Sequence, residues 1–154
     1  MTAAFDAEYA ATLAGEFGGY PDPCERYGRL LMDAFLTSRL VVDTGMNVFG
    51  WSLGRARQYM AEHALLSDAE VASETLRYST DIPAQALAYK MGEIKLDELR
   101  EECRQGLGPR FDLCDFHEAV LGPGAMPLEV LEWHVRHWVK DSAREGPRRT
   151  SLVT

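Results

Sequence analysis

Apolar side chains recur at helical spacing along most of the chain. Between residues 24 and 49 they lie four and seven positions apart, as at Leu31, Phe35, Val42 and Met46. Such spacing places apolar groups on one face of an α-helix. No stretch rich in β-branched residues alternates apolar with polar positions, and no hairpin turn signal is present. The pattern therefore predicts an all-α protein, a compact bundle of about six to seven helices with no sheet.

Glycine, proline and capping residues set the expected helix boundaries. Ser67 and Glu70 have the spacing of a capping box, Asp112 is expected to cap a later helix, and Pro83 suits a first helical turn. Gly45 lies inside a helix and is expected to weaken it by about 1 kcal/mol relative to alanine. The expected helices span residues 3–17, 24–49, 52–64, 67–78, 81–105, 112–121 and 127–142. We expect a single domain over residues 1–142 and a polar tail over 143–154.

Polar residues interrupt the apolar face of the helix expected over 81–105. Glu93 falls in the same stripe as Ile82, Tyr89 and Leu96, and Gln85 shares that stripe. A carboxylate on an apolar face is costly unless it is paired. One interpretation is that Glu93 binds an arginine elsewhere and holds helices in register. The other is that Gln85, Tyr89 and Glu93 line a pocket, where Tyr89 and Glu93 could transfer protons.

A second polar pair lies among apolar neighbours in the helix expected over 24–49. Arg39 and Asp43 are four residues apart, beside Phe35 and Val42. They form either an internal ion pair or a site in which Asp43 orients Arg39 toward an anionic ligand.

The histidines give weaker signals. His134 and His137 could share a helical face, but no third metal ligand is apparent near them. His117 and Glu118 could act as an acid–base element, although a packed, hydrogen-bonded histidine is the commoner role. No His-Glu-x-x-His, phosphate-loop, dinucleotide-binding or serine-elbow motif is present.

Composition narrows the classes of partner. The 154 residues include 24 acidic and 16 basic side chains, a formal net charge of −8, which argues against nucleic acid and anionic membranes as partners. No apolar run is long enough for a membrane span, and the first residues lack a signal-peptide pattern, so we expect a cytoplasmic protein. The three cysteines, Cys24, Cys103 and Cys114, are expected to be reduced and buried.

Three blocks of the sequence carry a family resemblance. They comprise residues 27–30, 39–45 and 50–52; residues 77–78 and 83–92; and residues 116–121 and 126–128. Together they resemble the C-terminal part of a bacterial family known as domain of unknown function 885, whose longer helical members look like zinc metallopeptidases. The metal motif of that family, a His-Glu element followed by Pro-Gly-His-His, is absent here. Asn47 stands where the family often has histidine, and Ala84 where it usually has glycine.

The resemblance implies that one wall of the peptidase site is kept without its metal. That wall would comprise Arg39, Asp43, Gln85, Tyr89 and Lys90, so we expect no metal and no other cofactor. The leading hypothesis is a protein that binds a small polar or anionic molecule, as a metal-independent acid–base enzyme of a biosynthetic pathway performing elimination, cyclisation or amide rearrangement. Its expected catalytic residues are Tyr89 and Glu93, and its expected substrate-binding residues are Arg39, Asp43, Gln85, Lys90, Tyr78 and Asn47.

Two other hypotheses remain open at this point. The chain could be a non-catalytic subunit that completes a separate zinc-bearing hydrolase, or a truncated relic that folds without activity. The subunit hypothesis would be favoured by a large exposed apolar patch. Association is expected in either functional case, as a twofold homodimer or as a complex with a metal-bearing partner chain.

Overall fold

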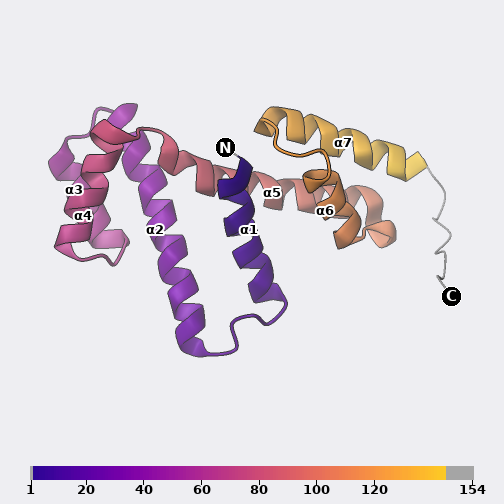
Figure 1. The fold of residues 1–154 in the computed structure, drawn as a ribbon, viewed down its shortest axis with the longest axis horizontal. Coiled ribbons are helices and arrows are strands. Elements are labelled where there is room, and N and C mark those ends of the chain that lie inside the picture. The colour runs from indigo at the N-terminus through magenta and orange to yellow at the C-terminus, as the bar shows by residue number, and fades with distance from the viewer. Residues whose placement is uncertain (1, 145–154) are drawn as a thin grey trace. The chain divides into compact units, whose positions relative to one another are not determined.

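The protein is built from α-helices throughout the part of the chain that the structure describes. The computed structural model describes residues 2–144, with side chains from residue 7 onward (Figure 1). No strand occurs within residues 2–144, so the predicted all-α class is confirmed. The α-helices are α1 (Thr2–Glu16), α2 (Pro23–Asn47), α3 (Leu53–His63), α4 (Asp68–Leu76), α5 (Gln85–Leu107), α6 (Leu113–Leu121) and α7 (Leu128–Arg144).

Side-chain caps start four of these helices. The predicted capping box at α4 is confirmed, because Ser67 accepts from the Glu70 N–H and Glu70 in turn accepts from the Ser67 N–H. Ser52 caps α3 by accepting from the Arg55 N–H, and Asp112 caps α6 by accepting from the Cys114 and Asp115 N–H groups. A second capping box, formed by Asp22 and Glu25 at the start of α2, was not predicted. These caps satisfy amide groups that a helix leaves unpaired at its N-terminus.

The start of α5 differs from the prediction. A helix was expected from residue 81 with Pro83 in its first turn, but the chain forms a short π-helix, η1 (Arg77–Asp81), and α5 begins only at Gln85. The reason is Ala84, whose φ of 67° lies in the left-handed region and cannot continue a right-handed helix. Its N–H donates to Asp43 Oδ1 at 3.1 Å, so a contact with α2 holds this turn.

Replacing Ala84 by glycine is expected to raise the free energy of unfolding by roughly 0.5–1 kcal/mol, because glycine adopts a positive φ without strain. The Ala84 side chain is exposed, so little packing is lost. The matched control is Ala10→Gly at an exposed position inside α1, which should destabilise by about 1 kcal/mol. Urea unfolding of both variants tests this, and destabilisation by Ala84→Gly would contradict it.

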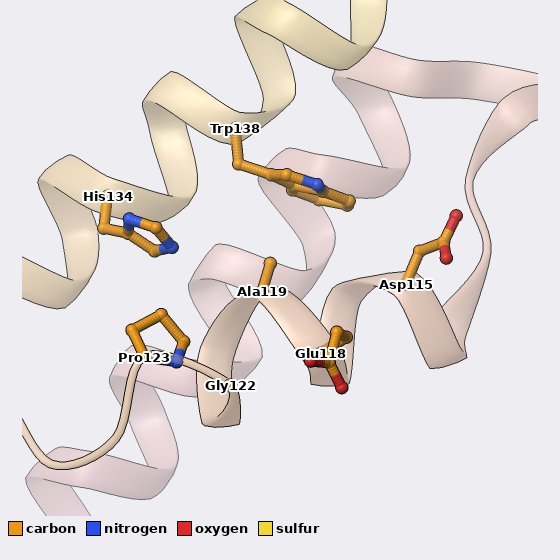
Figure 2. Close-up of a pocket in the computed structure, with 7 residues that line it drawn as sticks. All are labelled: Asp115, Glu118, Ala119, Gly122, Pro123, His134 and Trp138. Carbon is orange, nitrogen blue, oxygen red and sulfur yellow. The ribbon is translucent and has the colours of Figure 1, made fainter.

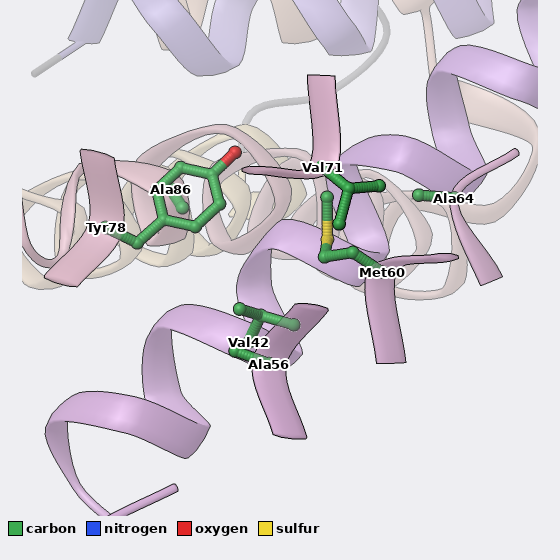
Figure 3. Close-up of a cluster of buried hydrophobic side chains, with 7 residues drawn as sticks. All are labelled: Val42, Ala56, Met60, Ala64, Val71, Tyr78 and Ala86. Atoms are coloured by element: carbon green, nitrogen blue, oxygen red, sulfur yellow. The ribbon is translucent and has the colours of Figure 1, made fainter. Parts of the chain in front are cut away.

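Contacts divide the chain into two compact units, of which one is Ala4–Glu93 and the other contains the chain from Ile94 onward. In the Ala4–Glu93 unit, α3 packs against both α2 and α4. Its core consists of side chains that are almost fully buried (Figure 3): Val42, Ala56, Met60, Ala64, Val71, Tyr78 and Ala86. Phe35, Met46 and Trp51 pack around this core, which confirms the predicted apolar face of α2.

The unit from Ile94 onward contains the second part of α5 together with α6 and α7. Its buried apolar side chains are Leu96, Leu99, Cys103, Leu107, Phe116, Ala119, Val120, Leu131 and Val135. A bidentate pair joins α7 to α5, because Arg136 donates to both carboxylate oxygens of Glu102 at 2.8 Å. A short 3-10 turn, η2 (Gly108–Arg110), links α5 to α6.

The prediction of three buried cysteines is right only for Cys103. Burial raises the pKa of the Cys103 thiol to about 11, which keeps it protonated and unreactive. Cys24 and Cys114 are exposed. Each is the second residue of a helix, two positions after its cap, where the side chain faces solvent.

The far C-terminal part of the chain lies outside the described residues, as does most of the predicted tail over 143–154. The last described helix continues to Arg144, two residues past its predicted end. The expectation of a single domain over 1–142 stays a prediction. Within the described residues, no helix is both long and apolar enough to cross a bilayer.

Candidate functional site

A pocket of about 330 Å³ that several charged side chains line lies among α1, α2 and the first turns of α5, within the Ala4–Glu93 unit. We call it the Glu93 pocket. Three of its lining residues have no polar side-chain group: Ala11, Gly15 and Leu30. The other lining side chains are polar or charged: Thr12, Tyr20, Arg29, Asp33, Lys90 and Glu93. The volume is at the small end of the range for ligand sites, which suits a metabolite of few atoms.

Glu93 is the most deeply placed charge of this pocket, with only 5% of its surface exposed. Its Oε1 accepts a hydrogen bond from the Thr12 hydroxyl at 3.0 Å and lies 3.5 Å from Arg29 Nη2. Its Oε2 accepts from Lys90 Nζ at 3.0 Å. Glu93 thus binds an arginine of another helix, as one interpretation of the sequence expected. It also lines a pocket, but Gln85 and Tyr89, which the other interpretation placed beside it, are not among the lining residues.

The two cations of the Glu93 pocket are each shared between carboxylates. Lys90 bridges Glu93 and Asp33, and Arg29 contacts Glu8 at 3.1 Å as well as Glu93. Burial lowers the pKa of Lys90, but its hydrogen bonds to Asp33 and Glu93 outweigh that effect, so the net pKa is raised. Lys90 therefore remains a cation at neutral pH, and positive and negative groups alternate around the pocket.

A second cluster surrounds Arg39, which lies farther along α2. The guanidinium carbon lies 5.2 Å from the ring centre of Phe35, 5.3 Å from that of Tyr78 and 5.4 Å from that of Tyr89. Rings at this range stabilise a cation. Its charge partner is Glu74 of α4, at 3.9 Å from Nε, and that Nε has no hydrogen bond.

Glu74 is the centre of this second cluster. It pairs with Arg77 at 2.6 Å and accepts a hydrogen bond from the buried Tyr78 hydroxyl. Burial raises the pKa of Tyr78, and the hydrogen bond to Glu74 raises it further. Tyr78 therefore stays protonated and acts as a donor.

Asp43 is 1% exposed and has a different role from the one expected. Its Oδ1 accepts from the Ala84 N–H at 3.1 Å and from Asn47 Nδ2 at 2.8 Å, while its Oδ2 has no partner. Asn47 also donates to the Tyr78 carbonyl at 3.2 Å. Asp43 thus fixes the turn before α5, and Arg39 pairs with Glu74 instead. The spacing of four residues placed both on one face of α2, but each side chain reaches a different neighbour.

The eight predicted site residues fall into different surroundings. Lys90 and Glu93 line the Glu93 pocket, whereas Arg39, Asp43, Asn47, Tyr78 and Tyr89 belong to the contacts around the start of α5. Gln85 is exposed. Sequence reasoning missed Thr12, Arg29, Asp33 and Glu74. The spacing of Arg29 and Asp33 resembles that of Arg39 and Asp43 and could have drawn attention to them, but no sequence signal tied Thr12 or Glu74 to the site.

The described side chains do not fit a zinc site of the kind that the longer family members resemble. They include no group of three or more His, Cys, Asp or Glu that could hold a metal ion. The His137 ring lies against the Trp133 ring at an interplanar angle of 34°, and its Nδ1 lies 2.7 Å from the Trp133 carbonyl. Burial and the nearby Arg100 lower the pKa of His117. We therefore derive no chemical step through a metal.

A further pocket of about 310 Å³ lies between α6 and α7, in the unit from Ile94 onward (Figure 2). We call it the α6–α7 pocket. It is lined by Asp115, Glu118, Ala119, Gly122, Pro123, His134 and Trp138.

Two comparisons with known proteins give matches. A family model described as "Bacterial protein of unknown function (DUF885)" matches residues 7–135. A crystal structure named as that of a "putative lipoprotein" from Colwellia psychrerythraea is 40% identical, with a TM-score of 0.85. The match covers 90% of this chain and 24% of that one, so the chain spans about a quarter of that protein's length. No curated protein sequence matches the chain.

Proposed function

The chain belongs to the DUF885 family of bacterial proteins, and we propose that its Ala4–Glu93 unit binds a small molecule with both an ammonium and a carboxylate group in the Glu93 pocket. The class is that of a free amino acid or the end of a short peptide. Arg29 and Lys90 would hold the carboxylate, and Glu93 and Asp33 would hold the ammonium. This class of ligand is narrower than the small polar or anionic molecule that the sequence predicts.

One observation carries the proposal: the pocket presents two cations and two carboxylates to a space of about 330 Å³. A zwitterion matches these paired charges. Its carboxylate can take the place of a protein carboxylate beside the two cations, and its ammonium can take the place of a protein cation beside the two carboxylates. A purely anionic ligand would leave Glu93 and Asp33 facing a like charge, which disfavours binding. Charged hydrogen bonds of this kind are stronger than neutral ones.

We further propose that the pocket performs acid–base chemistry on the bound molecule, with Glu93 as the group that transfers the proton. Glu93 lines the pocket, whereas Tyr89 contacts the Arg39 guanidinium and is not among the lining residues. We assign Tyr89 to positioning Arg39. If Glu93 transfers a proton, Glu93→Gln should lower turnover of a substrate by about 100-fold or more.

Replacing Lys90 by methionine is expected to weaken binding of L-alanine, L-glutamate or L-lysine by about tenfold, because one charged hydrogen bond to the carboxylate is lost. The three amino acids serve as probes of increasing size and are titrated by calorimetry. Lys95→Met is the matched control, since Lys95 lies on the same helix and pairs with Glu98 outside the pocket. Its affinity should equal that of the parent protein.

Matched ligands complete this experiment. N-acetyl-L-alanine lacks the ammonium and L-alanine methyl ester lacks the carboxylate, so both should bind more weakly than L-alanine. Equal binding of all three compounds would contradict the proposal, as would an equal loss in Lys90→Met and Lys95→Met. Absence of saturable binding by any of the three amino acids would also contradict it.

A second candidate function is favoured by the exposed apolar side chains of the Ala4–Glu93 unit. Five large ones are between 65% and 73% exposed: Phe17, Leu30, Val48, Phe49 and Leu65. Exposed apolar area is typical of a surface that meets another protein. The alternative is therefore a subunit that completes a zinc-bearing hydrolase of the same family. Co-purification with a chain that carries the His-Glu motif would support this alternative over the proposal.

A further inference from the structure

Four lining residues of the Glu93 pocket form its least polar part, which we call the Tyr20 subsite: Ala11, Gly15, Tyr20 and Leu30. The Tyr20 ring lies along α1, because its hydroxyl donates to the Ala11 carbonyl at 3.0 Å and a Cβ at Gly15 would lie 3.4 Å from its Cδ2. The ring thereby covers one helical turn of α1, about 6 Å in length. On α2, Leu30 lies one turn after Arg26, and Arg26 Nε donates to the Tyr20 carbonyl at 3.2 Å. These contacts place the four residues together.

The Tyr20 subsite offers a ligand no charge and no side-chain hydrogen-bond donor. The single hydroxyl proton of Tyr20 is engaged by the Ala11 carbonyl, and the other three residues have no polar side-chain group. Leu30 is 65% exposed, so a ligand that lies over it removes apolar surface from water. Removal of such surface stabilises a complex, whereas a polar group that is buried without a partner weakens it. The subsite therefore favours an apolar group.

The Tyr20 subsite directly adjoins the charged part of the pocket on two helices. On α1, Ala11 is followed by Thr12, which donates to Glu93 Oε1 at 3.0 Å. On α2, Leu30 is preceded by Arg29, which also lines the pocket. The α-carbon of an amino acid carries its ammonium group, its carboxylate and its side chain. When the two charged groups occupy the charged part of the pocket, the side chain therefore starts within reach of the subsite.

We propose that the Glu93 pocket selects amino acids with an apolar side chain, which lies in the Tyr20 subsite. This inference rests on the function proposed for the pocket, because the side chain reaches the subsite only when the ammonium and the carboxylate occupy the charged part. Tyr20 and Leu30 are the specificity-determining residues. They contact the part of the ligand that differs between amino acids, whereas the charged groups contact atoms that all amino acids share.

L-Leucine and L-asparagine form a matched pair of probes, because their branched side chains have nearly the same shape and only that of asparagine is polar. Calorimetric titration should give an affinity for L-leucine about tenfold higher than that for L-asparagine or L-alanine. Equal affinities for the three amino acids would overturn this inference and leave the function proposed for the pocket standing, since the shared charged groups would then account for all of the binding. Absence of saturable binding by any of the three would overturn both.

Leu30→Ala should lower the affinity for L-leucine by about threefold and leave the affinity for L-alanine unchanged, because only the larger ligand reaches this side chain. Leu30 is exposed, so the variant is expected to fold. The matched control is Met32→Ala, an exposed apolar residue of the same helix that is not among the lining residues, and it should change neither affinity. The ratio of the two affinities is the measured quantity, since a loss of folded protein would not change it.

Tyr20→Ala removes the ring of the subsite and should lower the ratio of leucine to alanine affinity by about fivefold. Tyr27→Ala is its matched control, because Tyr27 is an exposed tyrosine of α2 outside the pocket lining. A ratio that stays at the parent value in Leu30→Ala and Tyr20→Ala would overturn the inference. An equal change of the ratio in Leu30→Ala and Met32→Ala would overturn it as well.

Discussion

Replacing Asp43 by alanine is expected to lower the free energy of unfolding by about 3 kcal/mol. The change leaves the Ala84 N–H without its acceptor and removes one of the acceptors of Asn47, and an unpaired buried donor costs about 1–3 kcal/mol. It also creates a small cavity beside Val42, which is fully buried. Because the Ala84 contact holds the turn before α5, the loss should affect the whole Ala4–Glu93 unit. Urea unfolding followed by circular dichroism measures the effect.

Asp43→Asn is the matched control for this prediction. Asparagine keeps Oδ1, which accepts both hydrogen bonds, and it changes only the position of Oδ2, which has no partner. We therefore expect a loss of no more than about 1 kcal/mol. If Asn and Ala destabilise equally, the charge of Asp43 matters rather than its hydrogen bonds. If neither change matters, Asp43 does not fix the turn.

Replacing Gly45 by alanine should destabilise the protein by about 2 kcal/mol and lower the melting temperature by roughly 4–8 °C. A Cβ at this position would lie 2.5 Å from Trp51 Cδ2 and 2.6 Å from Trp51 Cε3. Trp51 cannot move away cheaply. Its backbone N–H donates to the Gly45 carbonyl at 2.9 Å, and the carbon of the Arg55 guanidinium lies 4.1 Å from its ring centre. The steric overlap exceeds the gain in helix propensity, which is about 1 kcal/mol.

Gly28→Ala tests the same substitution in the same helix without the overlap. Nothing lies within 4 Å of a Cβ at position 28, so alanine should stabilise α2 by about 0.5–1 kcal/mol. Thermal unfolding of both variants should therefore give shifts of opposite sign. Stabilisation by both substitutions would show that the Trp51 ring rearranges freely, and the prediction at Gly45 would be wrong.

The candidate site was predictable only in part. The stripe on α5 identified Glu93 as a polar residue on a buried face, and Glu93 does line the pocket. Its partners Thr12 and Arg29 lie 81 and 64 residues away along the chain. Helical periodicity gives the face of a residue but not the element opposite that face. For the same reason Arg39 and Asp43 were considered together, although Arg39 pairs with Glu74 and Asp43 with the turn before α5.

The sequence by itself determined the all-α class, most helix boundaries and the caps at Ser67 and Asp112, because these depend on residues within a few positions of one another. The tertiary structure alone decided three things that depend on contacts distant in sequence. One is the left-handed turn at Ala84, which a hydrogen bond from 41 residues away stabilises. Another is whether Gly45→Ala stabilises or destabilises the protein, because that depends on the contact with Trp51. The third is the pairing of buried charges, since burial makes each charge costly unless the fold supplies a partner.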